Sequence, residues 1–118
     1  DIPSDMTIRQ AFDFCNRRGE TKIPIYPAKY SRKKDEFREW CGIFNLYDAI
    51  YSIDEALWDA TPVSACARPL DFISDNLKLG ELIEKMRFRR ILFFVVLDGN
   101  KRQCGIVKPE DLASLLFE

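Results

Sequence analysis

Two aspartates stand six residues after a glycine in two related stretches of the sequence. CGIFNLYDAI covers residues 41–50 and CGIVKPEDLA covers residues 104–113, and the offset is the same for the glycines (105 − 42 = 63) and for Asp48 and Asp111 (111 − 48 = 63). In each stretch a strand-like run leads into a helical pattern, so each carboxylate is expected in the first turn of a helix. The repetition indicates either two copies of one packing unit or two halves of a binding site.

The first copy can be explained by helix capping. Asn45 stands at the N-cap position with Asp48 three residues on, close to a capping box. The second copy fits this explanation less well, because the Lys108 side chain has donors only, although Pro109 suits a first helical position. Lys108 is a suitable counter-ion for a phosphate at a helix N-terminus, with Asp111 left to accept hydrogen bonds from ribose hydroxyls. The sequence leaves both interpretations open.

Composition excludes several classes of protein. The 118 residues are 47% apolar and 31% charged with a formal net charge of −1, which is typical of one soluble domain, or two small units sharing a core, without a general attraction to nucleic acid. There is no histidine, which removes Ser-His and Cys-His catalysis and the usual zinc sites, so we do not expect an enzyme. The longest apolar run, residues 91–97, is too short to span a bilayer, and we expect no transmembrane helix.

The chain contains four cysteines and no C-x-x-C pair. At this density a disulfide scaffold is not expected. We therefore expect reduced, mostly buried thiols in a cytosolic domain. The cysteines are Cys15, Cys41, Cys66 and Cys104.

Hydrophobic periodicity predicts the same order of elements twice. Helical spacing over residues 8–15 and again over 79–86 leads in each case into a strand-like run, Lys22 to Tyr26 and Phe93 to Val96. Pro24 should place the first of these strands at a sheet edge or at an irregularity. The sequence DGNK predicts a hairpin before a second strand at Gln103 to Val107.

Each copy is expected to close with a helix. The apolar spacing that predicts them covers residues 46–57 in the first copy and 112–116 in the second. The long link at residues 27–39 is interpreted as a solvated hairpin tip. Residues 61–74 begin the second copy and have no counterpart ahead of the first, so the chain is expected to be a domain excised from a longer protein.

The strings GIFNLYD and GIVKPED match the G-h-x-T/S-x-x-D pattern of CBS domains, and with the strands KIPIY and FFVV the whole chain resembles a CBS domain pair, or Bateman module. KIPIY is similar to the R-I-P-V-Y segment of the cytosolic CBS pairs of CorC/hemolysin-like and cyclin M-type magnesium transporters. The resemblance implies an α+β fold of tandem βαββα repeats about a pseudo-two-fold axis, with repeat one at residues 1–58, lacking its N-terminal segment, and repeat two at 59–118.

The resemblance also implies a ligand. Many members bind adenine nucleotides (AMP, ADP or ATP, sometimes with magnesium) in clefts between the repeats. Carried over by position, Asp48 and Asp111 take the ribose-binding positions, while Lys22 and, in the corresponding region of repeat two, Arg90 are phosphate candidates. The sequence departs from the family at the Thr/Ser position, which is occupied by Asn45 in one copy and Lys108 in the other. We favour the second site, because Lys108 and Asp111 keep both a cation and an acid.

Two functions follow from the resemblance. The first is an adenine-nucleotide-sensing regulatory domain, the cytoplasmic part of a membrane-anchored transporter of magnesium or another divalent cation, which forms a homodimer and is attached to a transmembrane domain. The second is a CBS pair without ligand that serves as a dimerisation element. Neither involves catalysis, a catalytic cofactor, a bound structural metal or nucleic acid.

Overall fold

The computed structural model of the chain describes residues 1–29, 39–89, 93–108 and 111. The chain forms two compact units, Asp1–Pro69 and Leu70–Glu118. Residues 59–69 belong to the first compact unit because their backbone bonds to it: Ile8 N–H donates to Thr61 O (2.9 Å) and Val63 N–H to Met6 O (2.8 Å). The predicted boundary between the two sequence repeats, after residue 58, is a different boundary from the one between the compact units. It stays a prediction.

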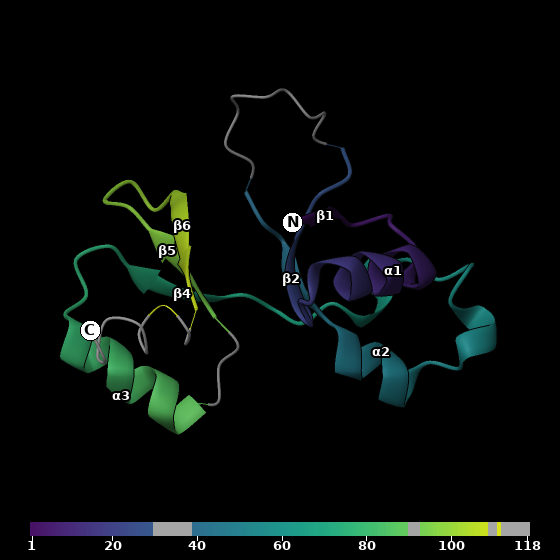
Figure 1. Ribbon diagram of the computed structural model, residues 1–118. Helices are drawn as coiled ribbons and strands as arrows, with labels where there is room; N and C mark the ends of the chain where they lie inside the picture. Colours follow the sequence, from purple (N-terminus) through teal and green to yellow (C-terminus); the bar gives the residue numbers. More distant parts are fainter. Residues whose placement is uncertain (30–38, 90–92, 109–110, 112–118) are drawn as a thin grey trace. The chain divides into compact units, whose positions relative to one another are not determined.

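The first unit is a three-stranded sheet in the order β1-β2-β3 with two helices (Figure 1). Strands β1 and β2 are parallel, and β2 and β3 are antiparallel. Two short 3-10 turns follow the second helix. The elements are β1 (Ile2–Pro3), α1 (Ile8–Arg18), β2 (Lys22–Tyr26), β3 (Gly42–Asn45), α2 (Leu46–Ser52), η1 (Glu55–Leu57) and η2 (Val63–Cys66).

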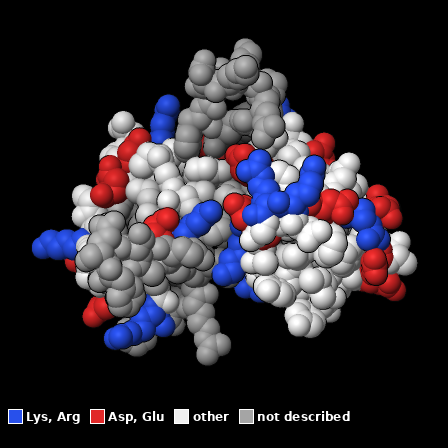
Figure 2. Space-filling model, viewed as in Figure 1, with Lys and Arg blue, Asp and Glu red and all other residues white. Residues whose placement is uncertain are grey.

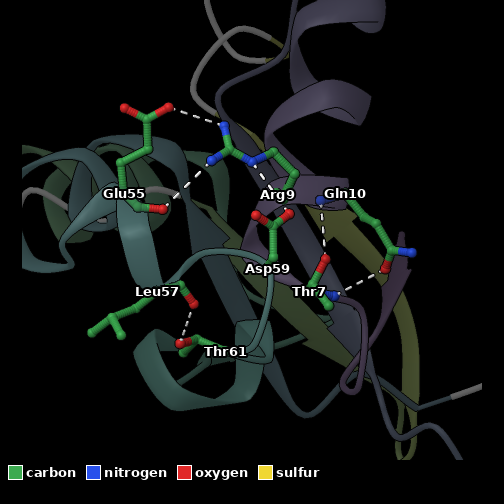
Figure 3. Close-up of polar contacts among 7 residues, drawn as sticks. All are labelled: Thr7, Arg9, Gln10, Glu55, Leu57, Asp59 and Thr61. Atoms are coloured by element: carbon green, nitrogen blue, oxygen red, sulfur yellow. Dashed lines mark hydrogen bonds and ion pairs between the residues drawn. The ribbon is translucent and has the colours of Figure 1, made fainter.

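Helix α1 forms where its apolar spacing predicts it. Thr7 and Gln10 make a capping box, in which Gln10 N–H donates to Thr7 Oγ1 (3.2 Å) and Thr7 N–H donates to Gln10 Oε1 (3.1 Å), as Figure 3 shows. Gly19 ends the helix in the left-handed conformation with φ 65°. The buried stripe, which includes Ile8 and Cys15, packs into the core of the unit.

Of the two alternatives predicted for Pro24, a sheet edge or an irregularity, the edge is wrong, because β2 is the central strand of its sheet. Pro24 lies opposite Ile43, whose backbone N–H and C=O bond to Arg68 on the other side of β3. Pro24 is therefore at a position where no hydrogen bond to β3 is needed. Pairing with β1 begins one residue later, at Ile25. The pairing of β2 with β1 therefore does not require the backbone N–H that proline lacks.

Helix α2 is shorter than its apolar spacing predicts. It ends at Ser52 because Ile53 takes an extended backbone (φ −127°, ψ 124°), and Leu57 lies in η1 instead. The turn that follows is fixed to α1 through Trp58, whose ring lies 5.4 Å from that of Phe12 and whose Nε1 donates to Ile53 O (3.0 Å).

Arg9 fixes the same turn from the side of α1. Its guanidinium bonds to Glu55 Oε1 (3.0 Å) and lies 3.5 Å from Asp59 Oδ1, as Figure 3 shows, and it lies over the Trp58 ring at 5.2 Å. The pKa of Arg9 is raised, chiefly by its hydrogen bond to Glu55. Burial lowers this pKa by a smaller amount, and the negative charges of Asp59 and Glu55 raise it further. These contacts join residues 55–61 to the start of α1.

The second unit repeats the first. It has a three-stranded sheet in the order β4-β5-β6, with β4 and β5 parallel, β5 and β6 antiparallel, and a helix on the sheet (Figure 1). Its core includes Ile73, Leu82 and Phe94. The helix predicted at residues 112–116 lies outside the described residues. The elements are β4 (Asp71–Ser74), α3 (Leu79–Arg89), β5 (Phe94–Leu97) and β6 (Gln103–Val107).

The α+β fold with a duplicated unit is thus confirmed, and the sheet register gives the correspondence between copies. Ile2 pairs with Ile25 in the first sheet, as Ile73 pairs with Val96 in the second. Strand β1 is therefore a two-residue counterpart of β4, so this part of the segment expected to be missing from the first repeat is present.

The cysteines are free, as predicted, but they are not mostly buried. Cys15 is buried and Cys66 is half-buried, whereas Cys41 and Cys104 are exposed. The two exposed cysteines are the equivalent ones that precede Gly42 and Gly105. The cysteine of the shared Cys-Gly-Ile is therefore not part of the core in either copy.

None of the helices in the described residues is long and apolar enough to cross a membrane. Acidic and basic side chains are interspersed over the described surface that Figure 2 shows. This agrees with the nearly balanced charge of the sequence, 18 basic and 19 acidic residues.

Candidate functional site

The first Gly–Asp motif lies at the junction of β3 and α2. Asn45 ends the strand and caps the helix, with its Oδ1 accepting a hydrogen bond from Tyr47 N–H (3.1 Å). Its side chain is used in this cap and the residue is only 6% exposed. The capping interpretation is confirmed for Asn45.

Asp48, in the first turn of α2, has a partner from outside the motif. Arg68 Nε donates to Asp48 Oδ2 and Arg68 Nη2 donates to Asp48 Oδ1, both at 2.6 Å. This is a side-on, two-bond pair between a guanidinium and a carboxylate. The bond to Asp48 raises the pKa of Arg68, against a smaller lowering by burial. Asp48 is thus engaged by a cation from outside the motif.

Arg68 is held beside β3 by its backbone. Arg68 N–H donates to Ile43 O and Ile43 N–H donates to Arg68 O, both at 2.9 Å. Gly42 makes this approach possible, because a Cβ there would lie 3.2 Å from Ala67 Cβ and 3.2 Å from Arg68 O. Sequence reasoning missed Arg68. The signal was present in Gly42, which indicated that something approaches the strand closely, but the sequence does not say what.

Lys22 lies on the opposite side of β3 from Arg68, as the Cα partner of Asn45. Within the part of the chain that the structure describes, its ammonium makes no ion pair. Lys22 and Arg68 therefore flank the start of α2 on two sides of β3.

Arg90, the predicted counterpart of Lys22, lies outside the described residues. The register suggests a different counterpart. Ile23 pairs with Phe44 as Phe94 pairs with Val107, so Lys22 is equivalent to the residue before Phe94, which is the buried Phe93. By sheet register the first copy has a cation where the second has an apolar side chain.

The second motif closes on itself. Lys108 N–H donates to Asp111 Oδ2 (2.9 Å), and Asp111 N–H donates to Lys108 O (3.0 Å). Asp111 thus makes the backward half of a capping box while remaining exposed, and Lys108 contributes its backbone rather than its side chain. Gly105 differs from Gly42, because no described atom lies within 4 Å of a Cβ placed there.

The structure therefore brings the predicted residues together in two groups, one in each unit. Asn45, Asp48 and Lys22 lie around the start of α2, and Lys108 and Asp111 lie after β6. The described residues contain no cluster of three acidic or cysteine side chains fit to hold a metal ion. The groups present can form hydrogen bonds to hydroxyls and ion pairs with anions.

Residues 63–118 match the family model described as the CBS domain. This part of the chain is therefore similar to CBS domains. The first unit has the same strand order and pairing as the described part of the second, with a helix between its first two strands, so the chain has the architecture of a CBS pair. A comparison with curated proteins finds no match.

Solved structures of CBS domains share the fold along nearly the whole chain. One is the CBS domain of a bacterial CNNM/CorC family Mg2+ transporter, with TM-score 0.76, 18% identity, and coverage of 96% of this chain and 64% of that one, so the chain spans less than two thirds of it. A second is such a domain in complex with ATP, with TM-score 0.75, 19% identity, and coverage of 96% and 75%. A third is a hemolysin-like protein of Oenococcus oeni PSU that contains a CBS domain, with TM-score 0.76, 20% identity, and coverage of 99% and 80%.

Proposed function

We propose that this CBS pair is a regulatory module that binds an adenine nucleotide and forms the cytosolic part of a membrane-associated, hemolysin-like transporter of magnesium or another divalent cation. The observation that carries the proposal is the solved CBS domain in complex with ATP, which shares this fold over 96% of the chain. The CBS assignment also favours a regulatory role over a catalytic one.

The residues of the second motif have the chemistry for such a ligand. Asp111 is exposed, and although Oδ2 accepts from Lys108 N–H, a carboxylate has about four acceptor positions on its two oxygens. A ribose diol can bind to the positions that remain, and the Lys108 ammonium supplies the charge for a phosphate. Binding would change the attached transporter only through a difference in affinity for two arrangements of the module.

One observation favours the second candidate, a ligand-free pair that serves as a dimerisation element. Both motif aspartates have partners within the chain, Arg68 for Asp48 and the Lys108 amide for Asp111. A carboxylate that is already hydrogen-bonded within its own unit has a structural role even when no nucleotide is bound.

Calorimetric titration with AMP, ADP and ATP, each with and without magnesium, separates the two candidates. Nucleotide sensing predicts measurable heat and a rise in Tm on saturation, because a ligand that binds only the folded state stabilises it. Asp111→Ala should abolish binding, and Asp111→Asn should weaken it while keeping an acceptor for the Lys108 amide. Asp13→Ala is the matched control, since it removes one exposed carboxylate on α1 without touching either motif.

No heat and no change in Tm with any nucleotide would refute sensing and leave the structural candidate. Binding that survives Asp111→Ala but is lost in Asp48→Ala would place the ligand in the first motif instead. Light scattering tests the homodimer separately, and a monomer at high concentration would contradict it.

A further inference from the structure

The two motif aspartates occupy equivalent sequence positions but have different partners. Both Asp48 oxygens accept hydrogen bonds from the Arg68 guanidinium. In the described part of the second unit, by contrast, Asp111 accepts from a neutral amide of its own motif. A ribose diol would have to share both Asp48 oxygens with Arg68, which already fills one acceptor position on each of them.

Arg68 is placed for this contact before any ligand arrives. Its backbone is fixed to Ile43 by two hydrogen bonds, and the absence of a side chain at Gly42 lets it lie against β3. The Asp48 side chain is 23% exposed, which limits the room for a second partner. An arginine held in place within the same chain competes at a high effective concentration with a ligand from solution.

Charge strengthens this advantage. A guanidinium with two parallel N–H groups makes charge-assisted bonds, which are stronger than those between a neutral hydroxyl and the same carboxylate. The Arg68 side chain is itself half exposed (51%), so it can move into solvent when it is displaced. The pair can therefore open without leaving a buried cation.

We propose that Arg68 is an internal competitor for the first nucleotide site: it occupies Asp48 and must leave before a sugar diol binds there. This rests on the proposed function and adds a regulatory feature to it. It makes Asp111 the open position and Asp48 the closed one. Because Arg68 precedes the last residue of the first unit, Pro69, displacement of its side chain would act close to the connection to the second unit.

The test is the number of nucleotides bound per chain, measured by titration with ATP and magnesium and repeated with AMP. Wild type should bind roughly one nucleotide per chain and Arg68→Gln roughly two, since the freed carboxylate then accepts a second ligand. The second site should vanish again in the Arg68→Gln/Asp48→Asn double variant. Arg9→Gln is the control, because it removes an arginine from an ion pair with Glu55 that lies outside both motifs.

Arg68→Lys provides a second variant with the positive charge retained. A lysine cannot form the two-bond pair, so it should allow a second nucleotide to bind more weakly than in Arg68→Gln. A melting curve for each variant confirms that it is folded before the titration.

The outcomes separate this proposal from the proposed function. If wild type binds one nucleotide and Arg68→Gln still binds one, or binds it less tightly, competition by Arg68 is refuted while nucleotide sensing stands. Two nucleotides on wild type, or one that depends on Asp48, also refute it. If neither wild type nor Arg68→Gln binds, both proposals fail. If Arg68→Gln alone binds, at Asp48, competition stands and sensing by wild type fails.

Discussion

Ala67 fills the space beside Gly42: a Cβ on Gly42 would lie 3.2 Å from the Cβ of Ala67. This contact is the reason that glycine begins β3, since any larger residue must push residues 67–68 away from the strand. At the equivalent Gly105, no described atom lies within 4 Å of such a Cβ. The two copies of one motif thus use the same residue under different constraints.

Alanine at these two positions should therefore have different effects on the free energy of unfolding. Gly42→Ala should lower the free energy of unfolding by about 1–3 kcal/mol, because the neighbouring backbone must shift. Gly105→Ala should change it by no more than about 0.5 kcal/mol or raise it slightly, because alanine restricts the unfolded chain. Urea denaturation of both variants measures this, and equal effects would show that the contact with Ala67 does not constrain position 42.

The turn between β5 and β6 contains a strained residue. Lys101 has φ 60°, the left-handed conformation that costs a side chain about 1–2 kcal/mol, although Gly99 is two residues away. Asp98 fixes this turn, with its Oδ1 accepting from Asn100 N–H (2.8 Å) and Arg102 N–H (3.0 Å). The hairpin was predicted from DGNK, but the residue that takes the unusual conformation was not.

Lys101→Gly should stabilise the protein. The free energy of strain that is removed slightly exceeds the entropic cost of ordering glycine on folding. We therefore expect the free energy of unfolding to rise by about 1 kcal/mol or less. Lys101→Ala retains a Cβ and should give no gain, which makes it the control. The difference in denaturation midpoint between the two variants is the measurement, and its absence would contradict the strain.

The elements that the sequence predicted well are those with local signals. Helix α1 has its stripe and both caps within residues 7–19, and β2 and β6 have the predicted bounds. Strand β5 is shifted by one residue, to Phe94–Leu97, because an apolar run has no marker for its start. Local chemistry was thus sufficient for the order of the strands and helices in the described residues.

The features that escaped prediction depend on contacts between distant residues. Arg68 reaches Asp48 across 20 positions because the Arg68 backbone bonds to Ile43, and nothing in the residues around Arg68 indicates this pairing. The end of α2 is set likewise by the turn that Trp58 holds against α1, which periodicity does not report. The aspartate positions were found from spacing, whereas their partners required the fold.

The buried thiol of Cys15 gives the protein a specific dependence on alkaline pH. Burial, with a smaller contribution from Glu20, raises the pKa of Cys15 from 9.0 to about 11. Between these values the unfolded chain loses the thiol proton and the folded chain keeps it, so the free energy of unfolding falls as the pH rises. The slope from this group is at most about 1.4 kcal/mol per pH unit.

Cys15→Ala isolates that effect. The variant lacks the thiol, so its stability should decrease less steeply with pH over this range, whatever its stability at neutral pH. Denaturation at a series of pH values from about 8 to 11 compares the slopes of the two proteins. Parallel curves would mean that the thiol titrates alike in the folded and unfolded chains.

The two motifs should also differ in how much their fourth residue stabilises the fold. Asn45 caps α2 through its side chain, so Asn45→Ala should cost about 1 kcal/mol. Lys108 contributes only its backbone amide to the equivalent turn, so Lys108→Ala should leave the free energy of unfolding within about 0.5 kcal/mol of wild type. Thermal and urea denaturation of both variants measure the contrast. A comparable loss for Lys108→Ala would show that its side chain has a structural role, and the argument for keeping it as a phosphate counter-ion would then lose its basis.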